Sequence, residues 1–129
     1  MPRPASRQPT DGELEILRVL WEIGPAELGQ IRAALLQHRD VATTTVATML
    51  KIMLDKGLVS RSQREGAWLW RAKVSRDSAT RSVLGKVLSN VFDGSASKLV
   101  AHLLEDGRLS EGERNEILAL LAEHRRRER

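Results

Sequence analysis

The chain has 129 residues, of which 41% are hydrophobic and 29% charged, so it is long enough for one domain with a core. It has no cysteine, which excludes disulfides, thiolate zinc sites and a thiol nucleophile and fits a cytoplasmic protein. No apolar stretch of about 18 residues is present, so no membrane insertion is expected, and the formal net charge of +4 indicates a polyanionic partner only weakly.

Residues 1–9 contain three prolines and two arginines without an apolar pattern, which predicts a disordered arm. A helix is expected next, because Thr10-Asp11-Gly12-Glu13 has the spacing of a capping box. Gly24-Pro25 should end this helix, since proline cannot continue it. The apolar residues of the helix are Leu14, Leu17, Leu20, Trp21 and Ile23.

Two further helices are expected before the sequence pattern changes. The second runs from about residue 26 to residue 38 and places its apolar residues on one stripe, Leu28, Ile31 and Leu35. The third runs from about residue 43 to residue 56, and Gly57 is placed as its C-terminal stop. Its apolar residues recur at helical spacing and are Val46, Met49, Leu50 and Met53.

The period then changes from helix to strand. The segments "LVSRS" (58–62) and "AWLWRA" (67–72) are expected to form two short strands, joined by the turn "QREG" (63–66). Trp68 and Trp70 share one face of the second strand, and both are expected to pack into the core. Three helices and a hairpin within residues 10–74 predict a winged helix-turn-helix domain.

Residues 75–129 are predicted to form three helices, with breaks at Asp93-Gly94 and Asp106-Gly107 and a second capping box at Ser110–Glu113. Their apolar stripes are too wide for so short a segment to bury alone, so we expect a second copy of the chain to cover them. Folding back onto residues 10–74 is the alternative. The fold class is therefore mainly α, a winged helix-turn-helix followed by a three-helix dimerisation region, with these interface residues: Val87, Val91, Leu99, Leu103, Ile117, Leu118 and Leu121.

The third helix has a polar face that ordinary surface helices lack. On a wheel of about 100° per residue, Thr44, Thr48 and Lys51 point away from the apolar sector. Threonine is a weaker helix former than Glu or Lys, so this face is better explained by function than by solvation alone. Threonine can read base edges, and a helix start attracts phosphate. The expected DNA-binding residues are Thr43, Thr44, Thr45, Ala47, Thr48 and Lys51, with Arg61 and Arg64 from the hairpin.

Catalytic and metal-binding patterns are absent from the sequence. The three histidines, His38, His102 and His124, do not have the spacing of metal ligands. Neither a glycine-rich phosphate loop nor a Gly-x-Ser-x-Gly motif is present. We therefore expect no enzyme activity, no metal site and no cofactor.

Four segments resemble the penicillinase repressors, together with their methicillin-resistance and copper-responsive relatives. They are "ELEILRVLWEIGPAELGQI" (13–31), "TTTVATMLKIMLDKGLVSR" (43–61), the wing "GAWLWRA" (66–72) and "VFDGSASKLVAHLLEDGRLSEGERNEILALL" (91–121). The last is similar to the dimerisation region of these repressors. The likeness runs from about Thr10 to Glu123, and the order and spacing of the segments carry it.

The resemblance implies a homodimeric repressor of an antibiotic response that binds a palindromic operator in double-stranded DNA. In the family, residues aligning with Thr44, Thr45 and Ala47 read bases, although relatives often carry basic residues at the first and third of these positions. A membrane-bound sensor metalloprotease would relieve repression by triggering cleavage. The family's Asn-Phe cleavage pair falls on His102-Leu103, so the chain departs from that pattern. It also lacks the cysteine cluster of the copper-responsive members.

The residues by themselves leave a second function open. A winged-helix domain can act as a protein-interaction module, and the basic wing could then bind an acidic protein partner. Under either function we expect an arm at 1–9, a winged-helix domain at 10–74 and a helical dimerisation domain at 75–129. A gel shift with DNA from the chain's own promoter region separates the two functions.

Overall fold

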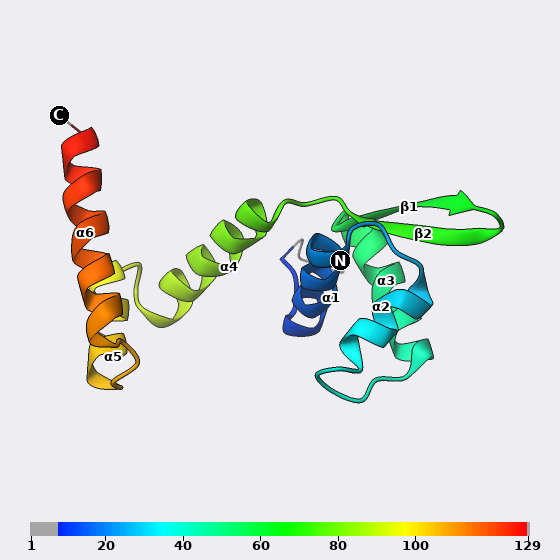
Figure 1. Ribbon diagram of the computed structural model, residues 1–129, viewed down its shortest axis with the longest axis horizontal. Coiled ribbons are helices and arrows are strands. Elements are labelled where there is room, and N and C mark those ends of the chain that lie inside the picture. The colour runs from blue at the N-terminus through cyan, green and yellow to red at the C-terminus, as the bar shows by residue number, and fades with distance from the viewer. Residues whose placement is uncertain (1–7, 129) are drawn as a thin grey trace, which may run out of the picture. The chain divides into compact units, whose positions relative to one another are not determined.

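The computed structural model describes residues 8–128, so the arm expected at residues 1–9 lies mostly outside the described part. Helices dominate, and one two-stranded antiparallel sheet follows the third helix. Figure 1 shows the elements, which in chain order are α1 (Asp11–Ile23), α2 (Leu28–Leu35), α3 (Thr43–Lys56), β1 (Val59–Arg64), β2 (Ala67–Ala72), α4 (Arg76–Val91), α5 (Ala96–Glu105) and α6 (Glu111–Arg127). The predicted winged helix-turn-helix with three following helices is confirmed.

By its contacts the chain divides into two compact units, residues 1–84 and residues 85–129. The division falls inside α4, beyond the expected domain boundary at residue 74. The first part of α4 belongs with the winged helix because Ala79 is buried and the indole Nε1 of Trp21 donates to the carbonyl of Val74 at 3.0 Å. The guanidinium of Arg76 also lies over the Trp21 ring, 5.6 Å from its centroid.

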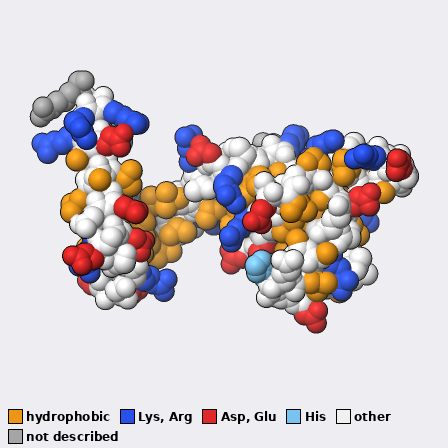
Figure 2. All heavy atoms as spheres, viewed as in Figure 1, with side chains coloured by type: hydrophobic (Ala, Val, Ile, Leu, Met, Phe, Trp, Pro, Cys, Tyr) orange, Lys and Arg blue, Asp and Glu red, His pale blue; other side chains and the backbone are white. Residues whose placement is uncertain are grey.

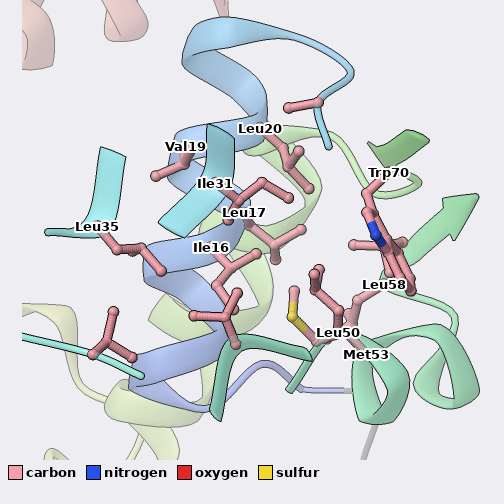
Figure 3. Packing of buried hydrophobic residues seen from close by; sticks show 14 residues of the cluster. Ile16, Leu17, Val19, Leu20, Ile31, Leu35, Leu50, Met53, Leu58 and Trp70 are labelled. Atoms are coloured by element: carbon pink, nitrogen blue, oxygen red, sulfur yellow. The ribbon is translucent and has the colours of Figure 1, made fainter. Parts of the chain in front are cut away.

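The core of the first unit lies between α1, α2, α3 and the hairpin. Aliphatic residues at helical spacing turn inward from all three helices and meet side chains of the hairpin (Figure 3). Each buried side chain of this size contributes about 1.5–3 kcal/mol by leaving water. The fully buried ones are Ile16, Leu17, Ile31, Val46, Leu50, Met53 and Val59.

Both ends of α1 are as the sequence predicts. The hydroxyl of Thr10 accepts from the amide of Glu13 at 3.2 Å, and the amide of Thr10 donates to Glu13 Oε1 at 2.9 Å. This reciprocal pair satisfies two amides that would otherwise have no partner in the helix. At the other end Gly24 has φ 82°, a conformation that favours glycine, and the helix stops there.

The prediction for α2 was too long at both ends. Ala26 is extended and forms a bridge with Trp70, since its amide donates to the Trp70 carbonyl at 3.0 Å and its carbonyl accepts from the Trp70 amide at 2.8 Å. A residue that donates and accepts in this way cannot also start a helix, so α2 begins only after Glu27. At its C-terminal end the chain turns at residues 36–38.

The hairpin is longer than expected and its turn is tighter. Residue pairing runs from Val59↔Ala72 to Arg64↔Ala67, which leaves only Glu65 and Gly66 in the turn. Both have positive φ, 53° and 82°, as the favoured two-residue hairpin turns require. The prediction that both tryptophans enter the core is correct for one of them only.

Trp70 is 5% exposed, whereas Trp68 is 42% exposed although it lies on the same strand face. The difference arises because the hairpin extends past the helices that form the core, and Trp68 is nearer to its tip (Figure 1). The exposed Trp68 is therefore available to contact other groups of the wing.

The second unit consists of the remainder of α4 with α5 and α6. Ser95 caps α5 by accepting from the Lys98 amide at 3.2 Å, and Ser110 caps α6 by accepting from the Glu113 amide at 3.1 Å. None of the described residues of this unit is buried, and Figure 2 shows hydrophobic side chains at its surface. Across residues 8–128, no helix is both long and apolar enough to cross a membrane.

Candidate nucleic-acid interface

The third helix presents its polar residues on the side opposite to the core. Val46, Leu50 and Met53 are fully buried and fix the rotation of α3. The exposed side therefore holds Thr43, Thr44, Thr45, Thr48 and Lys51, while Ala47 is half-buried beside them. The outward placement of these residues, predicted from the helical wheel, is confirmed. The exposed side chains at the start of α3 are small and polar.

The start of α3 has free hydrogen-bonding capacity. Its N-cap is Ala42, which has no side chain able to satisfy the first-turn amides. Among the described residues, the hydroxyls of Thr43, Thr44 and Thr45 find no hydrogen-bond partner, whereas that of Thr48 donates to the Thr44 carbonyl at 2.9 Å. Free amides at a helix start bind anions, and unpaired hydroxyls can donate or accept.

The hairpin brings an arginine next to this helix. The guanidinium of Arg61 lies 4.0 Å from the ring centroid of Trp68 and 5.4 Å from that of Trp70. A cation over an aromatic face is attracted to the ring, so the two indoles hold Arg61 in place. Arg64 is the last residue of β1 and is exposed next to the turn. Figure 2 shows Lys and Arg side chains along the hairpin.

A hollow of about 340 Å³ lies between α2, α3 and the hairpin. The hollow was not predictable from the sequence, because its walls come from three elements. It brings together Ala47, Lys51 and Arg61, which were predicted separately as DNA-binding residues. Arg64 does not line it and borders a second hollow with Pro25, Gln30 and Leu69. The other walls of the first hollow are mainly apolar and include Leu28, Leu50, Trp68 and Trp70.

The predicted interface residues of the C-terminal helices lie at the surface of the chain. Val87 and Val91 are 37% and 66% exposed, and Leu118 and Leu121 are 64% and 63% exposed. Leu99, Leu103 and Ile117 are half-buried. His102 is exposed, and its ring meets that of Phe92 edge-on with the centroids 5.6 Å apart. The bond from His102 to Leu103 lies inside α5.

The penicillinase repressor family model matches residues 9–123, which is most of the chain. The chain belongs to the penicillinase repressor family. The penicillinase repressor of Bacillus licheniformis is 23% identical to it over 122 residues, which cover 95% of each chain. A similar solved structure is the solution structure of the monomeric form of Bacillus licheniformis BlaI in complex with the blaP half-operator. It has a TM-score of 0.45 and 16% identity and covers 60% of this chain and 88% of that chain.

Proposed function

We propose that this member of the penicillinase repressor family is a homodimer that represses transcription by binding a palindromic operator in double-stranded DNA. The single observation that supports this most is the exposed start of α3, where unpaired threonine hydroxyls meet free first-turn amides. In a winged helix-turn-helix this helix enters the major groove. Thr44, Thr45 and Thr48 would face base edges, and the half-buried Ala47 allows a close approach.

Positive side chains on two elements would bind the DNA backbone. Lys51 lies farther along the exposed side of α3, and Arg61 and Arg64 lie on β1. None of the three is in an ion pair with a described acidic residue, so their charge is available to phosphates. Phosphate contacts of this kind fix the register of a protein on the duplex and contribute affinity without sequence preference.

Two copies of the chain would pair through the C-terminal helices. On α6, Leu118, Leu120 and Leu121 are each about two-thirds exposed, at 64%, 64% and 63%. Contiguous apolar surface of this kind usually marks an interface, and a second copy of the same chain is the commonest partner. A dimer of two winged helices would match the two halves of a palindromic operator.

The direct test is a mobility shift with duplex DNA from the chain's own upstream region and a scrambled duplex of equal length. Preference for the promoter duplex at physiological salt would support the repressor. Equal and weak binding to both, together with tight capture of an acidic protein partner, would favour the protein-interaction module instead. The wing of this chain carries enough positive charge to bind either kind of partner, so the scrambled duplex is the essential control.

Thr45→Ala should weaken binding to the operator by about 1 kcal/mol, roughly fivefold, and leave binding to unrelated DNA almost unchanged. The reason is that the exposed Thr45 side chain would contact a base edge, and only the operator has the matching base at that position. Fluorescence anisotropy with both duplexes measures the difference. Thr80→Ala is the matched control, because Thr80 is an exposed threonine on α4. A triple alanine variant at Thr44, Thr45 and Thr48 that keeps full operator preference would contradict this assignment.

Lys51→Ala should weaken binding to all DNA sequences alike. A lysine on a phosphate releases about one counterion, so the slope of log affinity against log salt should become shallower by about one. Titrations at several salt concentrations measure that slope. Lys86→Ala, at an exposed lysine of α4, should leave the slope unchanged. A loss confined to the operator would mean that Lys51 reads a base.

We also propose that cutting α5 near His102-Leu103 relieves repression, in response to a membrane-bound sensor metalloprotease. The cut would separate Leu99 from Leu103, two half-buried residues of the expected interface. Because the bond lies within a helix, α5 must unfold locally before a protease can bind it. Fragments mapped from cells treated with a cell-wall-active antibiotic test this. An intact chain in cells whose target genes have switched on would exclude cleavage as the switch.

A further inference from the structure

The hollow between α2, α3 and the hairpin has the properties of a small-molecule site. Its volume, about 340 Å³, lies within the usual range for ligand pockets of about 300–1,000 Å³. The side chains of Leu28, Ala47 and Leu50 give it apolar walls from two helices, and Trp68 and Trp70 close it on the hairpin side. Apolar walls with a few charged groups at one side are the common composition of such sites.

The side chains that line the hollow carry more positive than negative charge. Lys51 and Arg61 line it, and neither forms an ion pair with another described residue. The one acidic residue that lines it is Glu27, whose backbone amide donates to Gln30 Oε1 at 2.9 Å at the start of α2. An anion entering the hollow would therefore meet two cations and one carboxylate, a net positive charge.

We propose that this hollow binds a small carboxylate with an apolar, aromatic-sized body and that the bound carboxylate competes with DNA. The guanidinium carbon of Arg61 lies 4.0 Å from the Trp68 ring centroid, and a guanidinium held in this way can still donate two parallel hydrogen bonds to a carboxylate. Lys51 adds a second positive charge, and the body of the ligand packs against Leu28, Leu50 and Ala47. A cation would be repelled, and a neutral apolar molecule would leave both cations unused.

Competition with DNA follows from which residues line the hollow, and this part depends on the function proposed above. Lys51 and Ala47 belong to the α3 surface assigned to DNA, and Arg61 is assigned to phosphates. A ligand that binds only the DNA-free protein lowers the apparent DNA affinity by the factor 1 + [ligand]/Kd. Such a ligand would release the operator without cutting the chain.

Binding is tested with benzoate and indole-3-acetate as probes, titrated into the full-length chain while the tryptophan indole N–H signals are followed by NMR. We expect the signals of Trp68 and Trp70 to shift with saturation, while that of Trp21 stays in place. Trp21 does not line the hollow, and its indole N–H donates to the Val74 carbonyl. Benzyl alcohol, which has an aromatic body and no charge, should bind at least about tenfold more weakly, because it cannot form the charge-assisted hydrogen bonds that a carboxylate accepts.

Arg61→Gln should reduce the affinity for both carboxylates about tenfold. Arg71→Gln is the matched control, because Arg71 lies on β2, bonds to Ser62 Oγ at 3.0 Å and does not line the hollow. Any one of three results would overturn the carboxylate site. They are an unchanged carboxylate affinity in Arg61→Gln, binding of benzyl alcohol as tight as that of the carboxylates, and indole N–H shifts that never saturate. This measurement contains no DNA, so it remains decisive even if the chain does not bind an operator.

A second measurement tests competition. At a probe concentration equal to its Kd, the apparent affinity for operator DNA should fall twofold, and Arg61→Gln should make the probe ineffective at that concentration. Sodium chloride at the same ionic strength controls for screening. Saturable carboxylate binding with unchanged DNA affinity would overturn the competition and leave the function of the winged helix intact.

Discussion

A chain cut after Leu84 should be a folded monomer that has lost most of its affinity for a two-half-site operator. Within residues 8–128, every buried residue lies in the first unit, the last of them being Ala79, so the cut removes no core. It removes α5 and α6, on which most of the expected dimer contacts lie. Two linked domains bind two half-sites with an avidity of about 10²–10⁴ over one domain, so the loss should be at least a hundredfold.

Sedimentation and mobility shifts with one-half-site and two-half-site duplexes measure the effect. The full chain should strongly prefer the two-half-site duplex, and the shortened chain should bind each half-site independently. Leu118→Glu in the intact chain should have the same effect, because it places a charge on the expected interface. Ala119→Glu is the control, since at about 100° per residue the exposed position 119 points away from Leu118, Leu120 and Leu121. A full-length chain that is monomeric at micromolar concentration would contradict the prediction.

Features that depend on neighbouring residues were predictable from the sequence. The helix α3 was expected at residues 43–56 and is found at Thr43–Lys56, because an apolar period and a glycine stop define it. Gly57 has φ 79°, a left-handed conformation that glycine adopts readily. The capping boxes at Thr10 and Ser110 were also predicted, since each depends on residues three positions apart.

Features that depend on distant residues were not predictable. The bridge from Ala26 to Trp70 shortens α2, and nothing near Ala26 in the sequence indicates a partner in the hairpin. The exposure of Trp68 depends on how far the hairpin reaches beyond the helices. The alternating pattern of the strand predicts which residues share a face, but it does not predict that distance. The hollow needs three elements to come together, so its lining residues could be identified one by one but not as a site.

A buried ion pair is another distant contact, and Lys56→Met should show its importance by lowering the free energy of unfolding by about 3 kcal/mol. Lys56 Nζ lies 2.7 Å from Glu13 Oε1, and the two side chains are only 10% and 4% exposed. Methionine keeps the apolar stem of the lysine and removes its charge, which leaves a buried carboxylate without its cation. The Thr10 amide still donates to Glu13, so we expect the lower end of the range for broken buried pairs.

The effect of Lys56→Met should depend on pH. Burial raises the pKa of Glu13, but the hydrogen bonds from Lys56 and Thr10 and the charge of Lys56 outweigh it, so the pKa lies below its ordinary value. The stabilisation from this carboxylate is therefore complete above the unfolded pKa of about 4.3 and is lost as the pH falls toward the folded pKa. Without Lys56 the pKa should rise, and the variant should approach the parent in stability as the pH falls. Urea unfolding between neutral pH and acid measures both changes.

Two controls separate the buried charge from a general effect of losing a lysine. Arg39 and Glu15 form a pair 2.9 Å apart whose side chains are 46% and 39% exposed, so Arg39→Met should cost less than about 1 kcal/mol and show little dependence on pH. The double variant Glu13→Gln with Lys56→Met should recover part of the loss, because a glutamine oxygen can still accept from the Thr10 amide without a buried charge. A Lys56→Met that costs no more than Arg39→Met, or a double variant no more stable than Lys56→Met, would show that solvent already screens this pair.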